Sequence, residues 1–175
     1  PPVSRNPFSG ADKYPSTVAY YQQRLVFGNT NTNPEGAWAS QSGLFKNFNV
    51  SIPLIDSDAV SFTLAGKQVN EILFLIDMGK LLALTSGAEW AIMGDSSGII
   101  TPSQINARQY SSSGVTEITP IVIGQTIIYI QSRGSIIRDL AYDYQVDGYH
   151  GNDLTVFSAH LFEGHTITGW AYQQN

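Results

Sequence analysis

The chain contains no cysteine. This absence excludes disulfide bonds, thiolate metal sites and cysteine nucleophiles. It does not fix the compartment, because cytosolic, virion and secreted proteins can all lack cysteine. Long apolar runs are also missing, and no stretch approaches the roughly 18 to 20 residues of a membrane-spanning helix. The chain opens on Pro1-Pro2 without a Met or a signal-like segment and stops at Asn175 just after an apolar stretch. We therefore expect a fragment of a longer polypeptide.

Charge is scarce as well. Only 13% of the residues are charged, and nine Lys and Arg against 14 Asp and Glu give a net charge of −5. Such a chain lacks the basic patch of a nucleic-acid binder and the basic face that an anionic membrane surface attracts. Apolar residues make up 42%, which is enough to bury a core, so disorder is not expected. The abundance of Gly, Ser, Thr, Asn and Gln beside Tyr, Phe and Ile favours an all-β protein with many tight turns.

The segment 69–95 predicts the basic structural unit. Short apolar runs bounded by Gly, Asp and Ser are typical of antiparallel meander strands. A helix would hold Gly79 and Gly87 in its interior, at roughly 1 kcal/mol each. The predicted strands are 72–76, 80–85 and 89–93, separated by turns at 77–79 and 86–88.

The same order of strand, turn and strand recurs before and after this unit. The first copy has strands 18–21, 24–28 and 37–40, with a polar loop at 29–36, and the third has 118–123, 126–131 and 135–140, with turns at Gly124-Gln125 and Arg133-Gly134. The middle strands begin at Arg24, Lys80 and Thr126, at intervals of 56 and 46 residues. A period of roughly 40 to 50 residues with three or four strands per unit is the sequence signature of a β-propeller. A non-repeating β-sandwich or barrel is the alternative.

The rest of the chain completes the fold prediction. Further strands are expected at 45–53, 59–64 and 99–108, and a polar loop at 143–152. Apolar residues at helical spacing predict a short helix near 153–162, with Asn152 or Asp153 as its N-cap and Gly164 as its stop. The segment 167–172 with Gln173-Gln174 repeats the phase of 19–23 and predicts the start of a fourth unit. We therefore expect residues 1–15 to form an extended arm or linker. Residues 16–175 should form an incomplete propeller of about three antiparallel meander blades plus the start of a fourth.

No motif for a catalytic, cofactor-binding or metal site is found, and none is assigned. A metal pair at His160 and His165, with His150 as the third histidine, would need more ligands than the sequence offers nearby. Asp56 and Asp58 lack the downstream Gly and Glu of a twelve-residue calcium loop, which favours a plain Asp-rich turn.

Two further groups of residues could serve a saccharide site. An acid pair for sugar hydrolysis can be imagined among Asp143, Asp147 and Asp153, which share one region with Tyr149 and His150. The aromatic residues Trp38, Trp90 and Trp170 could stack on sugars, although aromatic residues of repeated strands are more often core. Gln22-Gln23 and Gln173-Gln174 are interpreted as turn positions first and ligand contacts second.

Four segments stand out in collinear order: YYQQRLVFGNT (20–30), LLALTSGAEWAI (81–92), ITPSQI (100–105) and DGYHGNDLTVFSAHLFEGHTITGWAYQQ (147–174). Together, from about Tyr14 to the end of the chain, they resemble the tail nozzle family of tailed bacteriophages. This family is also called tail tubular protein B-like, and related chains act as tail stabilisation proteins. The resemblance implies a virion protein with a propeller in each subunit. About six subunits would form a ring around the distal tail channel through which DNA leaves. Family members are usually several times longer than this chain.

Three alternative functions are therefore considered, with the one most expected given first. The first is a structural subunit of the phage tail, located in the virion or in the host cytoplasm when expressed from a prophage. It would have no catalysis or cofactor of its own, and its partners would be further copies, other tail proteins and passing DNA. The alternative is a carbohydrate-binding propeller for host surface glycans, with 147–152 as the candidate loop. The third is a glycan hydrolase, which needs two carboxylates of perturbed pKa in one cleft.

Overall fold

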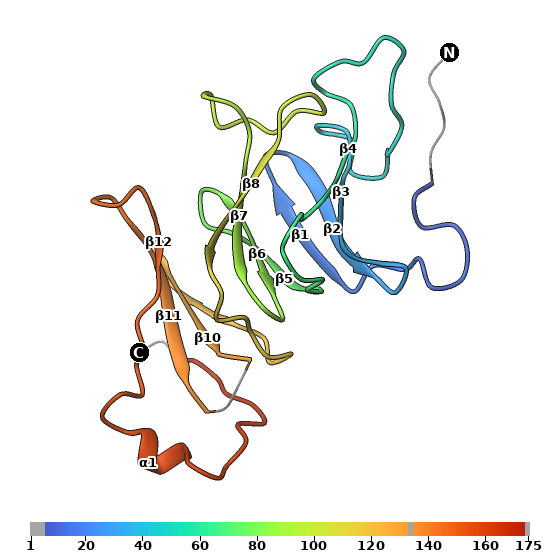
Figure 1. Ribbon diagram of the computed structural model, residues 1–175. Helices are drawn as coiled ribbons and strands as arrows, with labels where there is room; N and C mark the ends of the chain where they lie inside the picture. The colour runs from blue at the N-terminus through green and yellow to red at the C-terminus, as the bar shows by residue number, and fades with distance from the viewer. Residues whose placement is uncertain (1–5, 133–134, 174–175) are drawn as a thin grey trace.

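The computed structural model describes residues 6–132 and 135–173 and contains three four-stranded antiparallel sheets (Figure 1). We call them blades 1, 2 and 3. In each, strands that are consecutive in the chain are neighbours in the sheet. Blade 1 comprises β1 (Thr17–Tyr21), β2 (Arg24–Thr30), β3 (Asn33–Ala39) and β4 (Val60–Thr63). Blade 2 comprises β5 (Ile72–Asp77), β6 (Leu81–Thr85), β7 (Glu89–Met93) and β8 (Asn106–Ser111). Blade 3 comprises β9 (Ile121–Ile123), β10 (Thr126–Ile130), β11 (Ile137–Asp143) and β12 (Gly148–His150).

This arrangement confirms the predicted all-β fold of propeller-like meander blades. The blades follow one another in space as they do in sequence, with blade 2 between the other two (Figure 1). The first turn of each blade uses backbone with positive φ, as tight hairpins require. Gln22 and Gln23 have φ of 47° and 58°, Gly79 has 81° and Gly124 has 60°.

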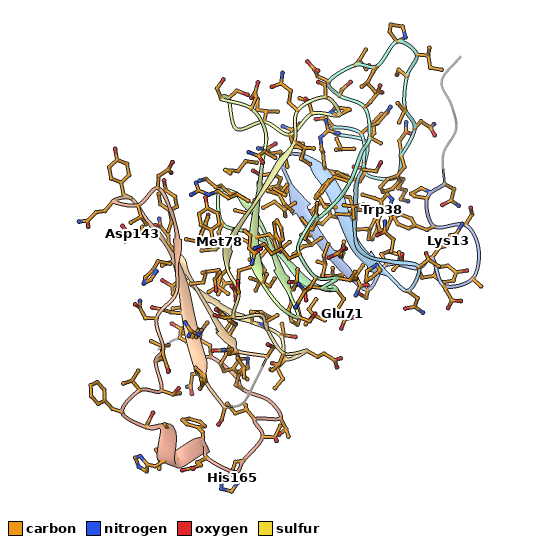
Figure 2. All side chains as sticks on the ribbon, in the orientation of Figure 1. Lys13, Trp38, Glu71, Met78, Asp143 and His165 are labelled. Atoms are coloured by element: carbon orange, nitrogen blue, oxygen red, sulfur yellow. The ribbon has the colours of Figure 1, made fainter. Side chains whose placement is uncertain are left out.

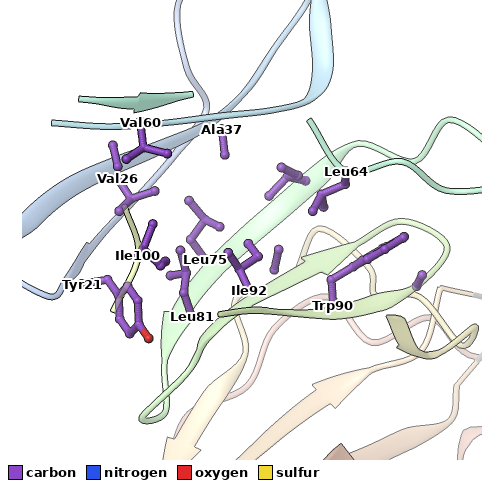
Figure 3. Close-up of a cluster of buried hydrophobic side chains, with 14 residues drawn as sticks. Tyr21, Val26, Ala37, Val60, Leu64, Leu75, Leu81, Trp90, Ile92 and Ile100 are labelled. Atoms are coloured by element: carbon purple, nitrogen blue, oxygen red, sulfur yellow. The ribbon is translucent and has the colours of Figure 1, made fainter. Parts of the chain in front are cut away.

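Blade 2 is covered on both faces, and this explains its apolar sequence. All five residues of β6 are buried. Leu81 and Ala83 belong to a core cluster with Tyr21 and Val26 of blade 1 (Figure 3). The alternate residues Leu82 and Leu84 belong to a second cluster, shared with blade 3. That cluster includes Ile127, Tyr129, Leu140 and Tyr149. Because successive side chains of a strand point to opposite faces, only a sheet between two neighbours buries every residue.

A glycine allows close packing at each of the two blade interfaces. A Cβ on Gly28 of blade 1 would lie 3.1 Å from Leu75 Cδ1 of blade 2. A Cβ on Gly148 of blade 3 would lie 2.6 Å from Tyr110 Cε1 of blade 2. The absence of a side chain at these two positions therefore helps the blades to approach each other.

Two predicted strands and two predicted loops are wrong. The expected polar loop 29–36 belongs largely to β2 and β3, because Asn31 and Thr32 alone make the turn between them. The segment 45–53 forms no strand, because its aromatic residues cover the outer face of blade 1 instead. There Phe48 packs against Phe27 of β2 and against Phe8 of the arm. The strand expected at 99–108 begins only at Asn106. The expected polar loop 143–152 contains β12, whose three residues pair with the end of β11.

The short helix is present but smaller than predicted. Helix α1 spans Ala159–Phe162, its N-cap is Ser158, and none of its residues is buried. Asp153 forms a β-bridge with Arg138, and the Leu154 N–H donates to the Ile137 carbonyl. The backbone at 153–154 thus continues the pairing along β11, so neither Asn152 nor Asp153 caps the helix. Gly164 follows the helix with φ of 75°.

The chain ends contain no further strand within the described residues. At 167–172, where the fourth unit was expected to begin, the Trp170 indole N–H donates to the Thr119 carbonyl at 2.8 Å. In the arm, Phe8 packs edge-on against Phe27 and Trp38 of blade 1. The predicted turn at Arg133-Gly134, the first five residues of the arm, Gln174 and Asn175 lie outside the described residues.

Candidate functional site

The β5–β6 turn at 77–80 is held from both sides by tyrosines of the neighbouring blades. From blade 1, the Tyr21 hydroxyl donates to the Gly79 carbonyl at 3.4 Å. From blade 3, the Tyr149 hydroxyl donates to the Met78 carbonyl at 2.9 Å. Within the turn, the Gly79 N–H donates to Asp77 Oδ1 at 2.9 Å. Burial raises the pKa of Tyr149 to about 12, so this hydroxyl remains a donor at neutral pH. The turn is therefore a fixed platform.

A hollow lies on each side of this turn. The larger, of about 540 Å³, is between blades 2 and 3 and is lined by residues 77–80, Gly124, Gln125, Tyr142 and Tyr149. We call it the tyrosine groove. A second hollow of about 430 Å³ lies between the turn and residues 93–98, next to Tyr21. In Figure 2, the labelled Met78 shows the blade 2 side of the tyrosine groove, and the labelled Asp143 shows the nearby end of blade 3. The volume of the tyrosine groove falls within the range of roughly 300 to 1,000 Å³ that is usual for small-molecule sites.

Tyr142, Asp147 and Lys80 meet at the edge of the groove. The Tyr142 hydroxyl donates to Asp147 Oδ1, and Lys80 Nζ lies 3.9 Å from the same oxygen. Lys80 Nζ also lies 5.0 Å from the centroid of the Tyr142 ring. The hydrogen bond from Tyr142, followed by the charge of Lys80, lowers the pKa of Asp147. The same hydrogen bond is the main reason why the pKa of Tyr142 is raised.

Three tyrosines continue this site across the blade interface. The rings of Tyr142 and Tyr149 meet edge to face at 5.6 Å, and those of Tyr149 and Tyr110 at 5.7 Å. The Arg108 guanidinium carbon lies 5.1 Å from the centroid of the Tyr110 ring. A cation therefore faces the tyrosine at each end of the row, the arrangement in which the ring quadrupole attracts positive charge.

The candidate histidines and acids are not gathered into one site. His150, His160 and His165 are exposed, and His165 lies at the far end of blade 3 from Asp143 (Figure 2). Over 6–132 and 135–173, no three His, Asp or Glu side chains are grouped so that they could hold a metal ion.

The candidate acid pair is engaged locally. Asp143 accepts from the Gln145 N–H, Asp147 from Tyr142, and Asp153 from the N–H and hydroxyl of Thr155. The hydroxyl and then the N–H of Thr155 lower the pKa of Asp153. Each of these carboxylates thus accepts hydrogen bonds from a residue close to it in the sequence.

Asp58 anchors the long loop between β3 and β4, as a structural Asp-rich turn would. Its buried carboxylate accepts four hydrogen bonds, from the N–H and hydroxyl of Ser51, the Ile55 N–H and the Gln41 amide. Burial alone would raise the pKa of Asp58, but these donors outweigh it and lower the pKa. The buried Arg24 guanidinium donates to the carbonyls of Ser40, Asp56 and Asp58 from the other side.

The aromatic and glutamine candidates have different environments. Trp90 is buried in the cluster between blades 1 and 2, as expected of a core residue. Trp38 and Trp170 are half-buried, so none of the three indoles is a fully exposed platform. Gln22 lies in the β1–β2 turn, and its amide donates to the Gly98 carbonyl and accepts from the Ile100 N–H.

Lys80, Arg108, Tyr110, Gln125 and Tyr142 were not identified as site residues from the sequence. They come from two strands and two turns of two blades, so no local motif contains them. For Lys80 and Gln125, the signal that could have found them is the recurrence of the first turn of each blade, which places both residues at the same end of their blades.

Comparisons with known proteins add no identity. No family model matches the chain, and no curated protein is significantly similar to it. Within the described parts of the chain, no helix combines the length and the apolar character needed to cross a bilayer.

Proposed function

We propose that the chain is part of a structural subunit of a phage tail, in the nozzle through which DNA leaves. The observation that carries the proposal is the blade-on-blade architecture, because a propeller in each subunit is what the resemblance to the tail nozzle family implies. The collinear order of the resembling segments supports the same assignment. In this role the chain acts by packing and needs no catalytic site.

The outer faces of the terminal blades support an assembly role. Val18 and Tyr20 on the outer face of blade 1 are 54% and 65% exposed. On the outer face of blade 3, Ile121, Ile123, Ile128 and Ile137 remain only partly buried. Apolar side chains of this kind are suited to contacts with further blades, further copies or other tail proteins.

Three of the seven described lysines and arginines are engaged within the fold, which supports weak contact with DNA. Arg24 is buried among backbone carbonyls, Arg138 donates to Gln131, and Lys80 lies beside Asp147. Each lysine or arginine that neutralises a phosphate adds affinity through counterion release. A conduit with few free cations allows the duplex to slide.

The test is to locate the protein in purified phage particles that encode this sequence. Peptides of the chain should be detected by mass spectrometry, and antibodies raised against it should label the distal end of the tail. Labelling of the capsid alone, or absence from the particles, would contradict the proposal.

A binding assay tests the conduit role separately. At about 0.15 M salt, where exposed charges are screened beyond roughly 8 Å, the folded chain should not retard duplex DNA. Strong retardation under these conditions would show that the chain grips phosphates, which a conduit lining should not do.

A further inference from the structure

The tyrosine groove has features that the structural role does not require. Tyr142 is 43% exposed although its hydroxyl is hydrogen-bonded, so part of its ring is accessible to a ligand. The Tyr149 ring packs against this ring at a centroid distance of 5.6 Å, and the Tyr149 hydroxyl is hydrogen-bonded to blade 2. An aromatic surface that is both exposed and fixed loses little conformational freedom when a ligand stacks on it.

Hydrogen-bond donors and acceptors line the groove together with the Tyr142 ring. Lys80 can donate from its ammonium group, which meets Asp147 only at 3.9 Å. Gln125 lies exposed on the β9–β10 turn, where its side-chain amide can both donate and accept. Asp77 accepts from Gly79 through Oδ1, which leaves its other carboxylate oxygen as an acceptor. A ligand with several hydroxyl groups can use such a mixture, because each hydroxyl both donates and accepts.

The charges of the groove favour a neutral ligand. Asp147 already occupies the position between Lys80 and the Tyr142 hydroxyl, and the charges of Lys80 and Arg108 both act on it. Two cations, Lys80 and Arg108, are thus balanced by Asp77 and Asp147. An anionic ligand would have to displace the Asp147 carboxylate.

We infer that the tyrosine groove is a binding site for a neutral saccharide, with one pyranose ring stacked on Tyr142. The Lys80 ammonium group, which lies 5.0 Å from the Tyr142 ring centroid, turns aside to donate to the sugar hydroxyls together with Gln125, and Asp77 and Gln125 accept from them. Stacking uses the apolar face of the sugar ring, and the polar groups at the rim fix its orientation. The candidate loop for glycans at 147–152 thus contributes Asp147 and Tyr149 as supports rather than as the stacking surface. The groove can bind a saccharide whether or not the chain belongs to a phage tail.

The test is an NMR titration of the ¹⁵N-labelled chain. The probes are neutral glucose and galactose oligosaccharides and, separately, a uronate-containing oligosaccharide, each up to about 10 mM, which detects even millimolar affinity. Neutral probes should shift the amide signals of Gly79 and Gly124, which line the groove. Absence of shifts with every neutral probe, shifts confined to other parts of the chain, or binding of the uronate alone would overturn the inference.

Variants then test the roles of the side chains. Tyr142→Ala should weaken binding roughly three- to tenfold, as expected for the loss of one aromatic stack. Tyr142→Phe keeps the ring and should bind within about twofold of the wild type. If Tyr142→Ala fails to fold, Gln125→Ala decides the matter. Gln125→Ala should weaken binding without any effect on folding, because this side chain is exposed. The matched control is Tyr14→Ala, which removes a 71% exposed tyrosine from the arm and should change nothing. Equal affinities of the wild type, Tyr142→Ala and Gln125→Ala would contradict the assignment.

Discussion

Replacing two adjacent leucines of the central strand separates this fold from other β architectures. Leu81 and Leu82 are each 1% exposed, and they point to opposite faces of blade 2. Leu→Ala at buried sites costs about 2 to 5 kcal/mol, with the larger values where the surroundings cannot collapse into the cavity. Leu82 belongs to a cluster with Ile127, Tyr129 and Leu140, each at most 1% exposed. We therefore expect both Leu81→Ala and Leu82→Ala to cost about 3 to 5 kcal/mol, a large part of a typical folding free energy of about 5 to 15 kcal/mol.

Urea unfolding followed by tryptophan fluorescence measures both costs, with the m-value checked for two-state behaviour. Val18→Ala is the control, because Val18 is 54% exposed on the outer face of blade 1 and should cost about 1 kcal/mol or less. A sheet with one solvent-facing side would bury only one of two successive residues. A large cost at one leucine and a cost below about 1 kcal/mol at the other would therefore refute the placement of blade 2 between two neighbours.

Three further substitutions test single features of the packing. Glu89 is 1% exposed beside Tyr129, whose pKa is raised by burial and then by the charge of Glu89. Neither carboxylate oxygen meets the distance and angle of a hydrogen bond within the described residues, so Glu89→Gln should raise the urea midpoint by removing a poorly compensated buried acid. A lower midpoint would show that the contact with Tyr129 stabilises the carboxylate. Asp58→Asn should lower stability at pH 7, because an amide cannot accept all four hydrogen bonds. The folded-state pKa of Asp58 lies below its ordinary value of 3.8, so its contribution is complete above that value and is lost as the pH falls below it. The difference between wild type and Asp58→Asn should therefore be constant at neutral pH and shrink as the pH falls below about 3.8 in urea titrations, and a difference that stays constant there would contradict this origin. Gly148→Ala should lower the free energy of unfolding by about 1 to 3 kcal/mol, because the added Cβ would meet the Tyr110 ring. Gly169→Ala is the control and should be neutral, because open space surrounds that position. Equal thermal stabilities of the two variants would argue against close packing of blades 2 and 3.

The first three strands of blade 2 could be predicted almost to the residue because they lie between two neighbouring blades. The predicted strands 72–76, 80–85 and 89–93 correspond to Ile72–Asp77, Leu81–Thr85 and Glu89–Met93. Burial on both faces produces continuous apolar runs, and the turns between them require Gly or Asp. The burial that positions these strands in the fold is therefore also visible in their sequence.

The missed strands lie at the blade edges, where packing constrains the sequence less. In β8, Asn106, Arg108 and Gln109 are exposed, so the strand carries no apolar pattern. Strand β12 has only three residues, and its pairing is set by β11 rather than by its own composition. The opposite error occurs at Phe45, whose ring packs on Tyr20 without any strand at 45–53. Apolar residues there cover a blade face from a loop.

The candidate groove could not be predicted because it depends on how two blades are stacked. Lys80 and Tyr142 are 62 positions apart in the sequence, yet the ammonium group lies 5.0 Å from the ring centroid. Sequence reasoning pointed to the region of Asp143, Asp147 and Tyr149 and considered an acid pair there without assigning one. The structure instead gives these residues supporting roles beside an aromatic surface.

The most direct test of the fold is a methyl-NOE spectrum of the ¹³C-labelled chain. The account predicts contacts from the Leu81 methyl groups to Val26 of blade 1, and from the Leu82 methyl groups to Ile127 or Leu140 of blade 3, because each pair shares one core cluster. Contacts from both leucines to the same sheet, or from neither to blade 3, would contradict the arrangement of three blades side by side.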